Sequence, residues 1–208
     1  MSARVLAAGT PLGQAKAAMI LVHGRGAPAE DILSLGRELD RPDLAYLAPQ
    51  AEGYSWYPYT FMAPMERNEP GLSNGLALLG HLLERLEADG IPPERTVLLG
   101  FSQGACLSLE FTARNAKRYG GIVGLSGGLI GPPGTPRGPA EYPGSFAGTP
   151  VFLGCSDRDP HIPLERVKET TEVLTRMGAK VTERIYPAMG HTVNEDELQH
   201  VRDLLAGL

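Results

Sequence analysis

The stretch that most constrains this chain runs from residue 96 to 109, where an apolar segment meets Gly-Phe-Ser-Gln-Gly at positions 100–104. Residues 96–101 have the composition of a buried strand, and a helix-forming segment begins directly after Ser102. Glycines on both sides of the serine let the backbone turn sharply without a Cβ clash, so the hydroxyl stands at the carboxyl end of the strand. The pattern predicts a nucleophile elbow with Ser102 as the candidate nucleophile.

A second Gly-x-Ser-x-Gly match, at positions 124–128, provides an internal comparison. It also follows an apolar run, but the residues after it include Leu-Ile-Gly-Pro-Pro-Gly, which cannot form a helix. A helix N-terminus would supply free N–H groups and a positive dipole end beside the serine, and Ser126 lacks one. We therefore expect Ser126 to be structural.

Strand-like and helix-like segments alternate along the chain. Strands are expected at residues 18–22, 44–48, 96–101, 121–125, 150–154 and 181–186, with room for one more short strand or hairpin before residue 18. Helical spacing of apolar residues marks the segments at 28–39, 72–86, 164–177 and 194–205, in addition to the helix after Ser102. This alternation predicts an α/β protein with a mostly parallel sheet covered on both faces, and residues 1–208 suit a single domain.

Three polar groups follow expected strands in the order Ser102, then Asp157 or Asp159, then His191. The carboxyl ends of parallel strands share one edge of the sheet, so these residues can meet. A serine hydroxyl needs an imidazole to accept its proton, and the imidazole needs an acceptor on its other nitrogen. The order and placement therefore predict a serine–histidine–aspartate triad.

Local geometry favours one of the two aspartates as the acid. Asp157 lies close to the end of its strand, where an aspartate often bonds to the backbone of its own loop. Asp159 precedes Pro160, which favours an extended backbone and removes one local N–H donor. We expect Asp159 to be the triad acid and Asp157 to shape the loop.

Two loops are candidates for the substrate pocket. Residues 49–62 hold the only tryptophan and show neither the periodicity of a helix nor that of a strand. This suggests that the loop forms a pocket wall that includes Trp56 and Tyr57, or alternatively that it plugs the edge of the domain. Residues 126–148 contain seven glycines and five prolines, too many for a regular element. This second loop follows the strand after the elbow, where parallel strands end at one edge of the sheet, so we expect both loops to frame the pocket.

The loop after the first convincing strand reads His23-Gly24-Arg25-Gly26. A glycine-bracketed loop upstream of a nucleophile elbow is where acyl-transfer enzymes of this type place a second oxyanion donor. His23 precedes the serine in the chain and sits at a strand end among apolar residues, so we expect it to be structural.

Composition narrows the function classes further. The two cysteines, Cys106 and Cys155, lie in apolar surroundings without metal-ligand spacing, which favours reduced core thiols and a cytoplasmic protein without a metal. The chain has no membrane-length apolar run and no pattern of a signal peptide. A net charge of −5 without a cluster of basic residues disfavours a nucleic-acid partner. The sequence is compatible with a monomer or a homodimer.

These motifs together resemble the phospholipase/carboxylesterase family of α/β hydrolases, which includes bacterial carboxylesterases and acyl-protein thioesterases. The likeness rests on residues 21–26, 100–105, 157–163 and 190–191, and it extends over almost the whole chain. The resemblance implies a single-domain α/β hydrolase in which Ser102, Asp159 and His191 form the triad. It also implies that the backbone N–H groups of Arg25 and Gln103 form the oxyanion hole.

Two residues depart from the family pattern: Arg25 replaces a small or apolar residue, and His161 an aliphatic one that many relatives have. Both add polarity at the mouth of the site, and His161 becomes a candidate substrate-binding residue. The resemblance implies a cofactor-independent serine hydrolase of small to medium esters or thioesters. The alternatives are a non-catalytic small-molecule binding protein on the same scaffold and a lactone hydrolase like dienelactone hydrolase, whose cysteine nucleophile Ser102 disfavours.

Overall fold

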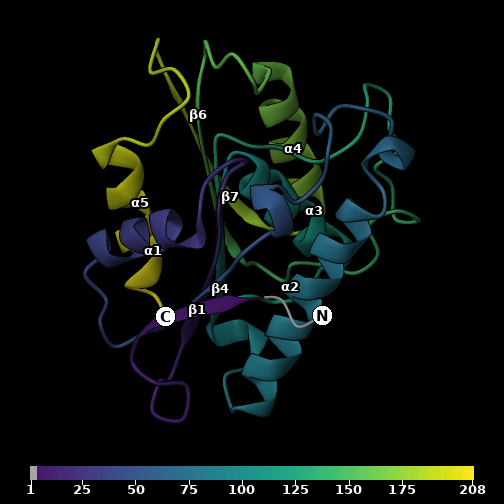
Figure 1. Ribbon diagram of the computed structural model, residues 1–208. Coiled ribbons are helices and arrows are strands. Elements are labelled where there is room, and N and C mark those ends of the chain that lie inside the picture. The colour runs from purple at the N-terminus through teal and green to yellow at the C-terminus, as the bar shows by residue number, and fades with distance from the viewer. Residues whose placement is uncertain (1–3) are drawn as a thin grey trace.

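The computed structural model describes residues 4–208, in which seven strands form one sheet in the order β1-β3-β2-β4-β5-β6-β7 (Figure 1). β1 pairs antiparallel with β3, and the other pairings in the sheet are parallel. The strands are β1 Val5–Gly9, β2 Ala18–Val22, β3 Ala45–Pro49, β4 Thr96–Phe101, β5 Gly121–Leu125, β6 Pro150–Ser156 and β7 Lys180–Tyr186.

Helices cover both faces of this sheet. The helices α1 Ala29–Glu38 and α5 Glu195–Leu205 lie on one face, and α2 Gly71–Ala88, α3 Gln103–Arg114 and α4 Leu164–Arg176 lie on the other (Figure 1). Short 3-10 turns occur at Glu52–Tyr54, Met65–Asn68 and Pro93–Arg95. The expected α/β architecture, mostly parallel and doubly covered, is confirmed.

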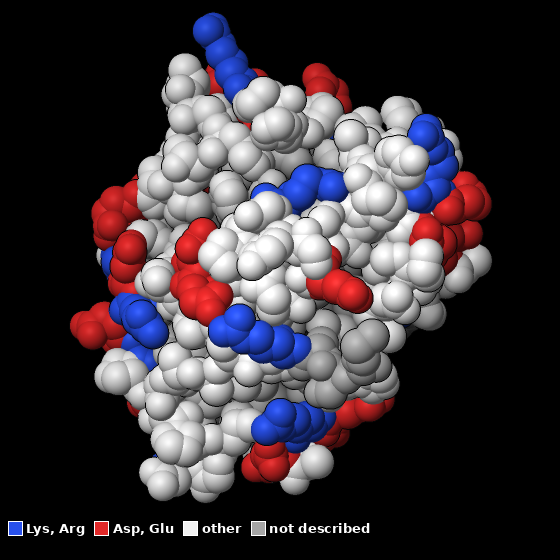
Figure 2. All heavy atoms as spheres, viewed as in Figure 1, with Lys and Arg blue, Asp and Glu red and all other residues white. Residues whose placement is uncertain are grey.

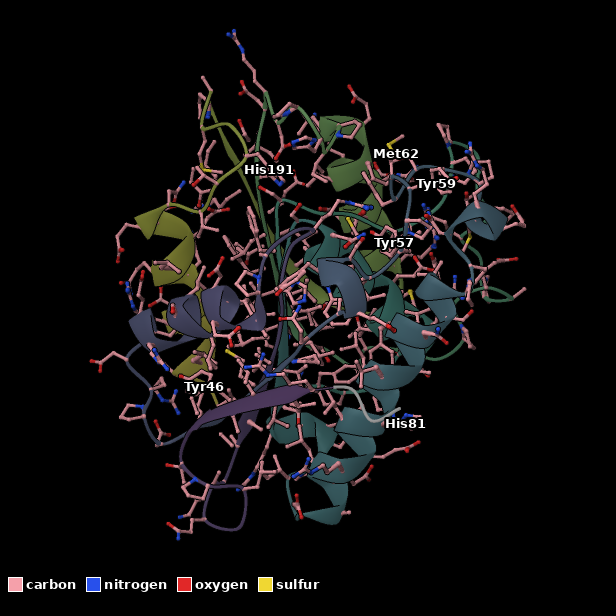
Figure 3. The ribbon with its side chains drawn as sticks, in the orientation of Figure 1. Tyr46, Tyr57, Tyr59, Met62, His81 and His191 are labelled. Atoms are coloured by element: carbon pink, nitrogen blue, oxygen red, sulfur yellow. The ribbon has the colours of Figure 1, made fainter. Side chains whose placement is uncertain are left out.

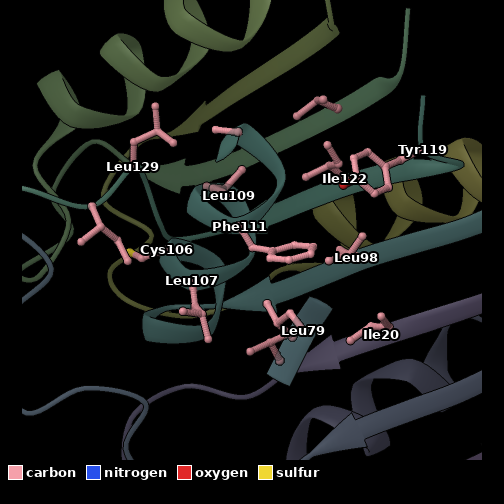
Figure 4. Packing of buried hydrophobic residues seen from close by; sticks show 14 of the residues in the cluster. Ile20, Leu79, Leu98, Cys106, Leu107, Leu109, Phe111, Tyr119, Ile122 and Leu129 are labelled. Atoms are coloured by element: carbon pink, nitrogen blue, oxygen red, sulfur yellow. The ribbon is translucent and has the colours of Figure 1, made fainter. Parts of the chain in front are cut away.

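The side chains of each central strand alternate between two apolar cores, as the period of a strand requires. In β2, Met19 and Leu21 face the core under α1 and α5, whereas Ile20 and Val22 face the larger core under α2, α3 and α4. Figure 4 shows Ile20 in this larger core with Leu98 and Ile122 of neighbouring strands and with Phe111 of α3. Strands buried on both faces explain why the sequence shows continuous apolar runs there.

The boundaries expected from sequence agree closely with these elements at the centre of the sheet. β2 and β5 match in full, and α5 opens with the capping box expected from Asn194 and Glu197. β6 runs two residues further than expected, through Ser156. β1 fills the place left for a short strand near the start of the chain.

The first part of the 126–148 loop belongs to the core. Leu129 and Ile130 are fully buried, and the Ile130 N–H donates to Glu110 Oε2 over 3.0 Å. The Arg166 guanidinium donates to the carbonyls of Leu129 and Gly131, over 2.6 and 2.7 Å. Residues 126–131 are therefore a fixed wall, and only the remainder of the loop reaches the surface.

Charged side chains of both signs are interspersed over the face seen in Figure 2, in keeping with the small net charge of −5. Within residues 4–208 every helix is too short or too polar to cross a membrane.

Candidate active site

Ser102 occupies a strained turn between β4 and α3. Its backbone has φ 55° and ψ −120°, a conformation that L side chains rarely adopt outside such elbows. The two motif positions have room only for glycine. A Cβ on Gly104 would overlap the carbonyl oxygen of Val22, and a Cβ on Gly100 would overlap the carbonyl oxygen of Gly104. Close packing of α3 against β2 and β4 therefore presents the serine at the carboxyl edge of the sheet.

Ser102, His191 and Asp159 form a continuous chain of hydrogen bonds. His191 Nε2 lies 2.8 Å from Ser102 Oγ, and His191 Nδ1 lies 2.7 Å from Asp159 Oδ2. With a proton on Nδ1, the imidazole donates to the carboxylate and leaves Nε2 free to accept the serine proton. This arrangement can activate the hydroxyl as a nucleophile.

The Asp159 side chain is fully buried and held by the backbone of its own loop. Its Oδ1 accepts hydrogen bonds from the N–H groups of His161 and Ile162, over 2.8 and 3.0 Å. These two donors fix the carboxyl plane, so Oδ2 is directed at the imidazole. Loop amides therefore both stabilise the carboxylate and orient it.

Ser156 and Asp157 hold the loop that carries His191. Ser156 Oγ accepts from the N–H of Gly190 over 3.1 Å, and Asp157 Oδ1 accepts from the N–H of Ala188 over 2.7 Å. Asp157 thus shapes a loop as expected, but it is the histidine loop that it binds. Ser156 did not emerge from the sequence, because its role depends on β6 running two residues beyond its last clearly apolar position.

The His191 ring contacts two other rings. Its centroid lies 5.0 Å from that of Phe101, and the exposed His161 meets it edge-on at 4.8 Å. Packing against these two rings limits rotation of the imidazole, which keeps both of its hydrogen bonds aligned. His161 therefore stands at the mouth of the site, next to the histidine.

The two candidate oxyanion donors also adjoin Ser102. Gln103 is the first residue of α3, where a backbone N–H has no acceptor within the helix. Arg25 follows Gly24, and a Cβ on Gly24 would lie 3.4 Å from Ser102 Cβ. The backbone of residues 24–25 thus passes directly beside the nucleophile, where a second N–H donor is needed.

The side chains of the same two residues clamp the loop at residues 55–59. Gln103 Oε1 accepts from the N–H of Trp56 over 2.9 Å, and Gln103 Nε2 donates to the carbonyl of Tyr57 over 2.8 Å. The Arg25 guanidinium donates to the carbonyls of Pro58 and Tyr59, over 2.9 and 2.5 Å. A polar Arg25 side chain is thus used to fix this loop against the oxyanion region.

The burial of Trp56 and Tyr57 corrects the expectation that their side chains form the wall of an open pocket. They are 4% and 2% exposed, and the Trp56 indole donates to the carbonyl of His23 over 2.8 Å. Both rings belong to the larger core, so the aromatic loop plugs the edge of the domain, the alternative that the sequence left open. Figure 3 shows Tyr57, Tyr59 and Met62 at the same end of the molecule as His191.

The hydrogen bonds of the Gln103 side chain to Trp56 and Tyr57, here called the clamp, predict an effect on the free energy of unfolding. Gln103→Ala should lower the free energy of unfolding by about 1–3 kcal/mol, because the buried N–H of Trp56 loses its acceptor. The matched control is Gln199→Ala, which removes a glutamine that bonds only at the exposed surface of α5. Urea denaturation measures both, and equal losses in the two variants would contradict the clamp.

His23 and Ser126 are both buried away from solvent. His23 accepts the Ala51 N–H at Nε2 over 3.1 Å and contacts the Gly24 carbonyl through Nδ1 at 2.7 Å, and burial lowers its pKa. It is a neutral side chain that ties β2 to the loop after β3. Ser126 shares the positive φ of Ser102 but is fully buried, so its hydroxyl cannot reach a substrate.

Glu197 is a buried carboxyl group in the first turn of α5, facing Gly154 of β6. Its Oε2 accepts from the N–H of Asn194 over 2.9 Å, whereas Oε1 has no partner in the described part of the chain and faces Gly154. Burial raises the pKa of this carboxyl from its ordinary 4.5 to about 7. The sequence suggested only a helix cap here.

The raised pKa predicts a pH-dependent stability. The Glu197 carboxyl ionises near pH 4.5 in the unfolded chain and only near pH 7 in the folded protein. Its contribution to the free energy of unfolding is therefore fully present below pH 4.5 and is lost as the pH rises through 7. The loss is about 3 kcal/mol at about 1.4 kcal/mol per pKa unit. Glu197→Gln keeps the cap and should flatten the fall in unfolding free energy between pH 5 and about 7.5. The exposed Glu195→Gln should leave the fall unchanged.

Within residues 4–208 no three His, Cys, Asp or Glu side chains are grouped so that they could hold a metal ion. The hydrogen-bonded trio and the two adjoining backbone N–H groups are of the kinds that acyl transfer uses: a candidate nucleophile, a base, an acid that orients the base, and two candidate donors to an oxyanion.

The fold and this hydrogen-bonded trio define an α/β hydrolase. Within that class the chain belongs to the phospholipase/carboxylesterase family, whose model matches residues 6–208. A solved phospholipase/carboxylesterase from Dyadobacter fermentans is 45% identical, with a TM-score of 0.93 over 99% of this chain and 97% of that one.

Curated relatives carry the name acyl-protein thioesterase 1. The protein from Debaryomyces hansenii is 29% identical over 94% of this chain and 91% of its own length. The protein from Gibberella zeae is 38% identical over 126 residues, which is 60% of this chain. The matched stretch spans about half, 53%, of the length of that fungal relative.

Proposed function

We propose that this protein is a serine hydrolase that cleaves carboxylic esters or thioesters of small to medium size through an acyl-enzyme. The observation that carries the proposal is the unbroken hydrogen-bonded path from Ser102 Oγ through His191 to Asp159 Oδ2. The family match over residues 6–208 supports it, as do relatives whose names include esterase and thioesterase.

The proposed reaction uses the groups of this site. Ser102 Oγ attacks the carbonyl carbon while its proton passes to His191 Nε2, and the N–H groups of Arg25 and Gln103 bind the resulting oxyanion. The carbon–oxygen or carbon–sulfur bond then breaks, and His191 returns the proton to the leaving alcohol or thiol. Water attacks the acyl-Ser102 ester with His191 as base, which releases the acid and restores the hydroxyl.

The proposed substrate is a small molecule. His161 at the mouth is the side chain placed to contact a bound substrate. We further propose a cytoplasmic location, because Cys106 and Cys155 are free, buried thiols whose pKa burial raises to about 12.

A panel of p-nitrophenyl esters and matched acyl thioesters of graded chain length tests this proposal. We expect saturable turnover without added metal or cofactor, with kcat/KM that varies along the series, because a fixed pocket discriminates by about 1–3 kcal/mol per methylene. A folded protein that turns over none of the panel would instead favour a non-catalytic binding protein on this scaffold. Preferential cleavage of lactones would favour the lactone hydrolase alternative.

A further inference from the structure

A cleft of about 450 Å³ opens beside the catalytic histidine, between α1 and the loop that leads into α5. Figure 1 shows α1 and α5 next to each other on one side of the sheet, and both belong to the same apolar core. His191, Thr192 and Val193 line one side of this cleft, and Gly24 of the oxyanion loop lines it as well. The cleft is thus continuous with the candidate active site.

The floor and the far rim of the cleft differ in chemistry. Ile32, Leu35, Phe101, Val193 and Leu198 supply apolar surface. Asp31 and Glu38, both exposed, are the acidic side chains along it, and lysine and arginine are absent from the described residues that line it. An occupant should therefore be apolar along its length and not negatively charged.

The two carboxylates and Leu35 mark the direction of the cleft. Asp31, Leu35 and Glu38 are spaced i, i+4, i+7, so they lie along one face of α1. The rise of an α-helix places Glu38 about 10 Å further along the axis than Asp31. Within residues 4–208 neither carboxylate takes part in an ion pair, so both can act on an occupant.

The role of His191 as proton donor decides whether the acyl chain or the leaving group of the substrate enters the cleft. His191 Nε2 returns the proton of Ser102 to the leaving oxygen or sulfur, so that atom must lie within hydrogen-bond reach of the imidazole. The residues that follow His191 form the wall of the cleft, so a chain attached to the leaving atom continues into it. The acyl chain is attached to the carbonyl carbon and departs from it in another direction.

We propose that the cleft between α1 and residues 191–193 is the leaving-group subsite, and that Asp31 and Glu38 select alcohols or thiols with an apolar stem and a neutral or cationic end. This inference rests on the proposed function, because it assigns an arm of the same ester or thioester. It makes Leu35 and the two carboxylates specificity-determining residues.

The test uses esters that share a butyryl group and differ in the alcohol: methyl, hexyl, 6-(trimethylammonio)hexyl and 5-carboxypentyl. With the unmodified protein, kcat/KM should be highest for the ammonium ester, intermediate for hexyl and lowest for the carboxylate. Leu35→Trp fills the cleft and should lower the hexyl-to-methyl ratio of kcat/KM about tenfold or more. If this variant melts early, the exposed Thr192→Trp takes its place.

The charge preference is tested separately. Asp31→Asn combined with Glu38→Gln should lower the ammonium-to-carboxylate ratio about three- to tenfold, because exposed charges act weakly. Glu30→Gln is the matched control: it lies on the same helix, is paired with Arg4 at 2.8 Å and does not line the cleft, so it should leave the ratio unchanged.

The outcomes separate the two proposals. A folded protein that is inactive on all four butyryl esters and on the p-nitrophenyl and thioester panel removes the proposed function and the subsite with it. Activity on methyl butyrate with ratios that Leu35→Trp does not change overturns the subsite alone. If Leu35→Trp instead alters the preference among methyl esters of graded acyl length, the cleft holds the acyl chain and the assignment of the leaving group is wrong.

Discussion

Replacing Asp159 by asparagine is expected to lower kcat about 10⁴-fold while the protein stays folded. Oδ1 of this residue accepts two backbone N–H groups, from His161 and Ile162, so an amide oxygen must occupy that position. The amide nitrogen is then forced towards His191 Nδ1, where it donates instead of accepting. The imidazole must carry its proton on Nε2, and it can no longer take the proton of Ser102.

Asp157→Asn is the matched control for this effect. Its Oδ1 accepts a single N–H, from Ala188, and an asparagine oxygen can replace it there. We expect this variant to keep kcat within about tenfold of the unmodified protein, because one neutral hydrogen bond to the histidine loop is preserved. Circular dichroism and steady-state kinetics on both variants give the comparison. A larger kcat loss in Asp157→Asn at unchanged melting temperature would exchange the roles of the two aspartates.

Ser102→Ala should lower kcat by about 10³-fold or more, as the loss of a nucleophile in such a triad does. The two residues of its hydrogen-bond chain, His191 and Asp159, remain in place, so the residual rate reports the oxyanion hole and binding alone. Removing the hydroxyl relieves no backbone strain, because alanine also disfavours φ 55°. The loss should therefore appear in kcat at nearly unchanged stability.

Ser126→Ala is the control that the chain itself offers. Ser126 has the same motif and a φ of 51°, but its hydroxyl is fully buried. Removing a hydroxyl that cannot reach a substrate should leave kcat unchanged. Equal activity losses in Ser102→Ala and Ser126→Ala, with both proteins folded, would show that the wrong elbow has been assigned.

The sequence predicts the fold well where one local rule decides the structure. β2 and β5 are apolar on both faces, and the helix behind Ser102 separates it from Ser126. The antiparallel β1 is harder to predict, because its residues are only half-buried or exposed and its composition is weakly patterned. The aromatic loop was ambiguous for a different reason: a buried tryptophan and a pocket tryptophan look alike until tertiary packing is known.

The sequence predicts the three residues of the hydrogen-bonded trio, but not the residues that hold their loops in place. The triad residues follow from chain order and strand ends, whereas Ser156 and the side chains of Arg25 and Gln103 act through bonds between loops distant in sequence. Ser156 and Gly190 are brought together by the parallel pairing of β6 with β7. The cleft along α1 depends in the same way on how two helices pack, which no local pattern encodes.

Labelling with an alkyl fluorophosphonate, read by intact mass and peptide mapping, tests the central claim most directly. The reagent reacts only with a serine whose proton has an acceptor beside an oxyanion hole, so it reports the assembled site without any choice of substrate. We predict one covalent adduct, located on Ser102, lost in Ser102→Ala and retained in Ser126→Ala. A folded protein that takes up no label, or takes it up on another residue, would contradict the account.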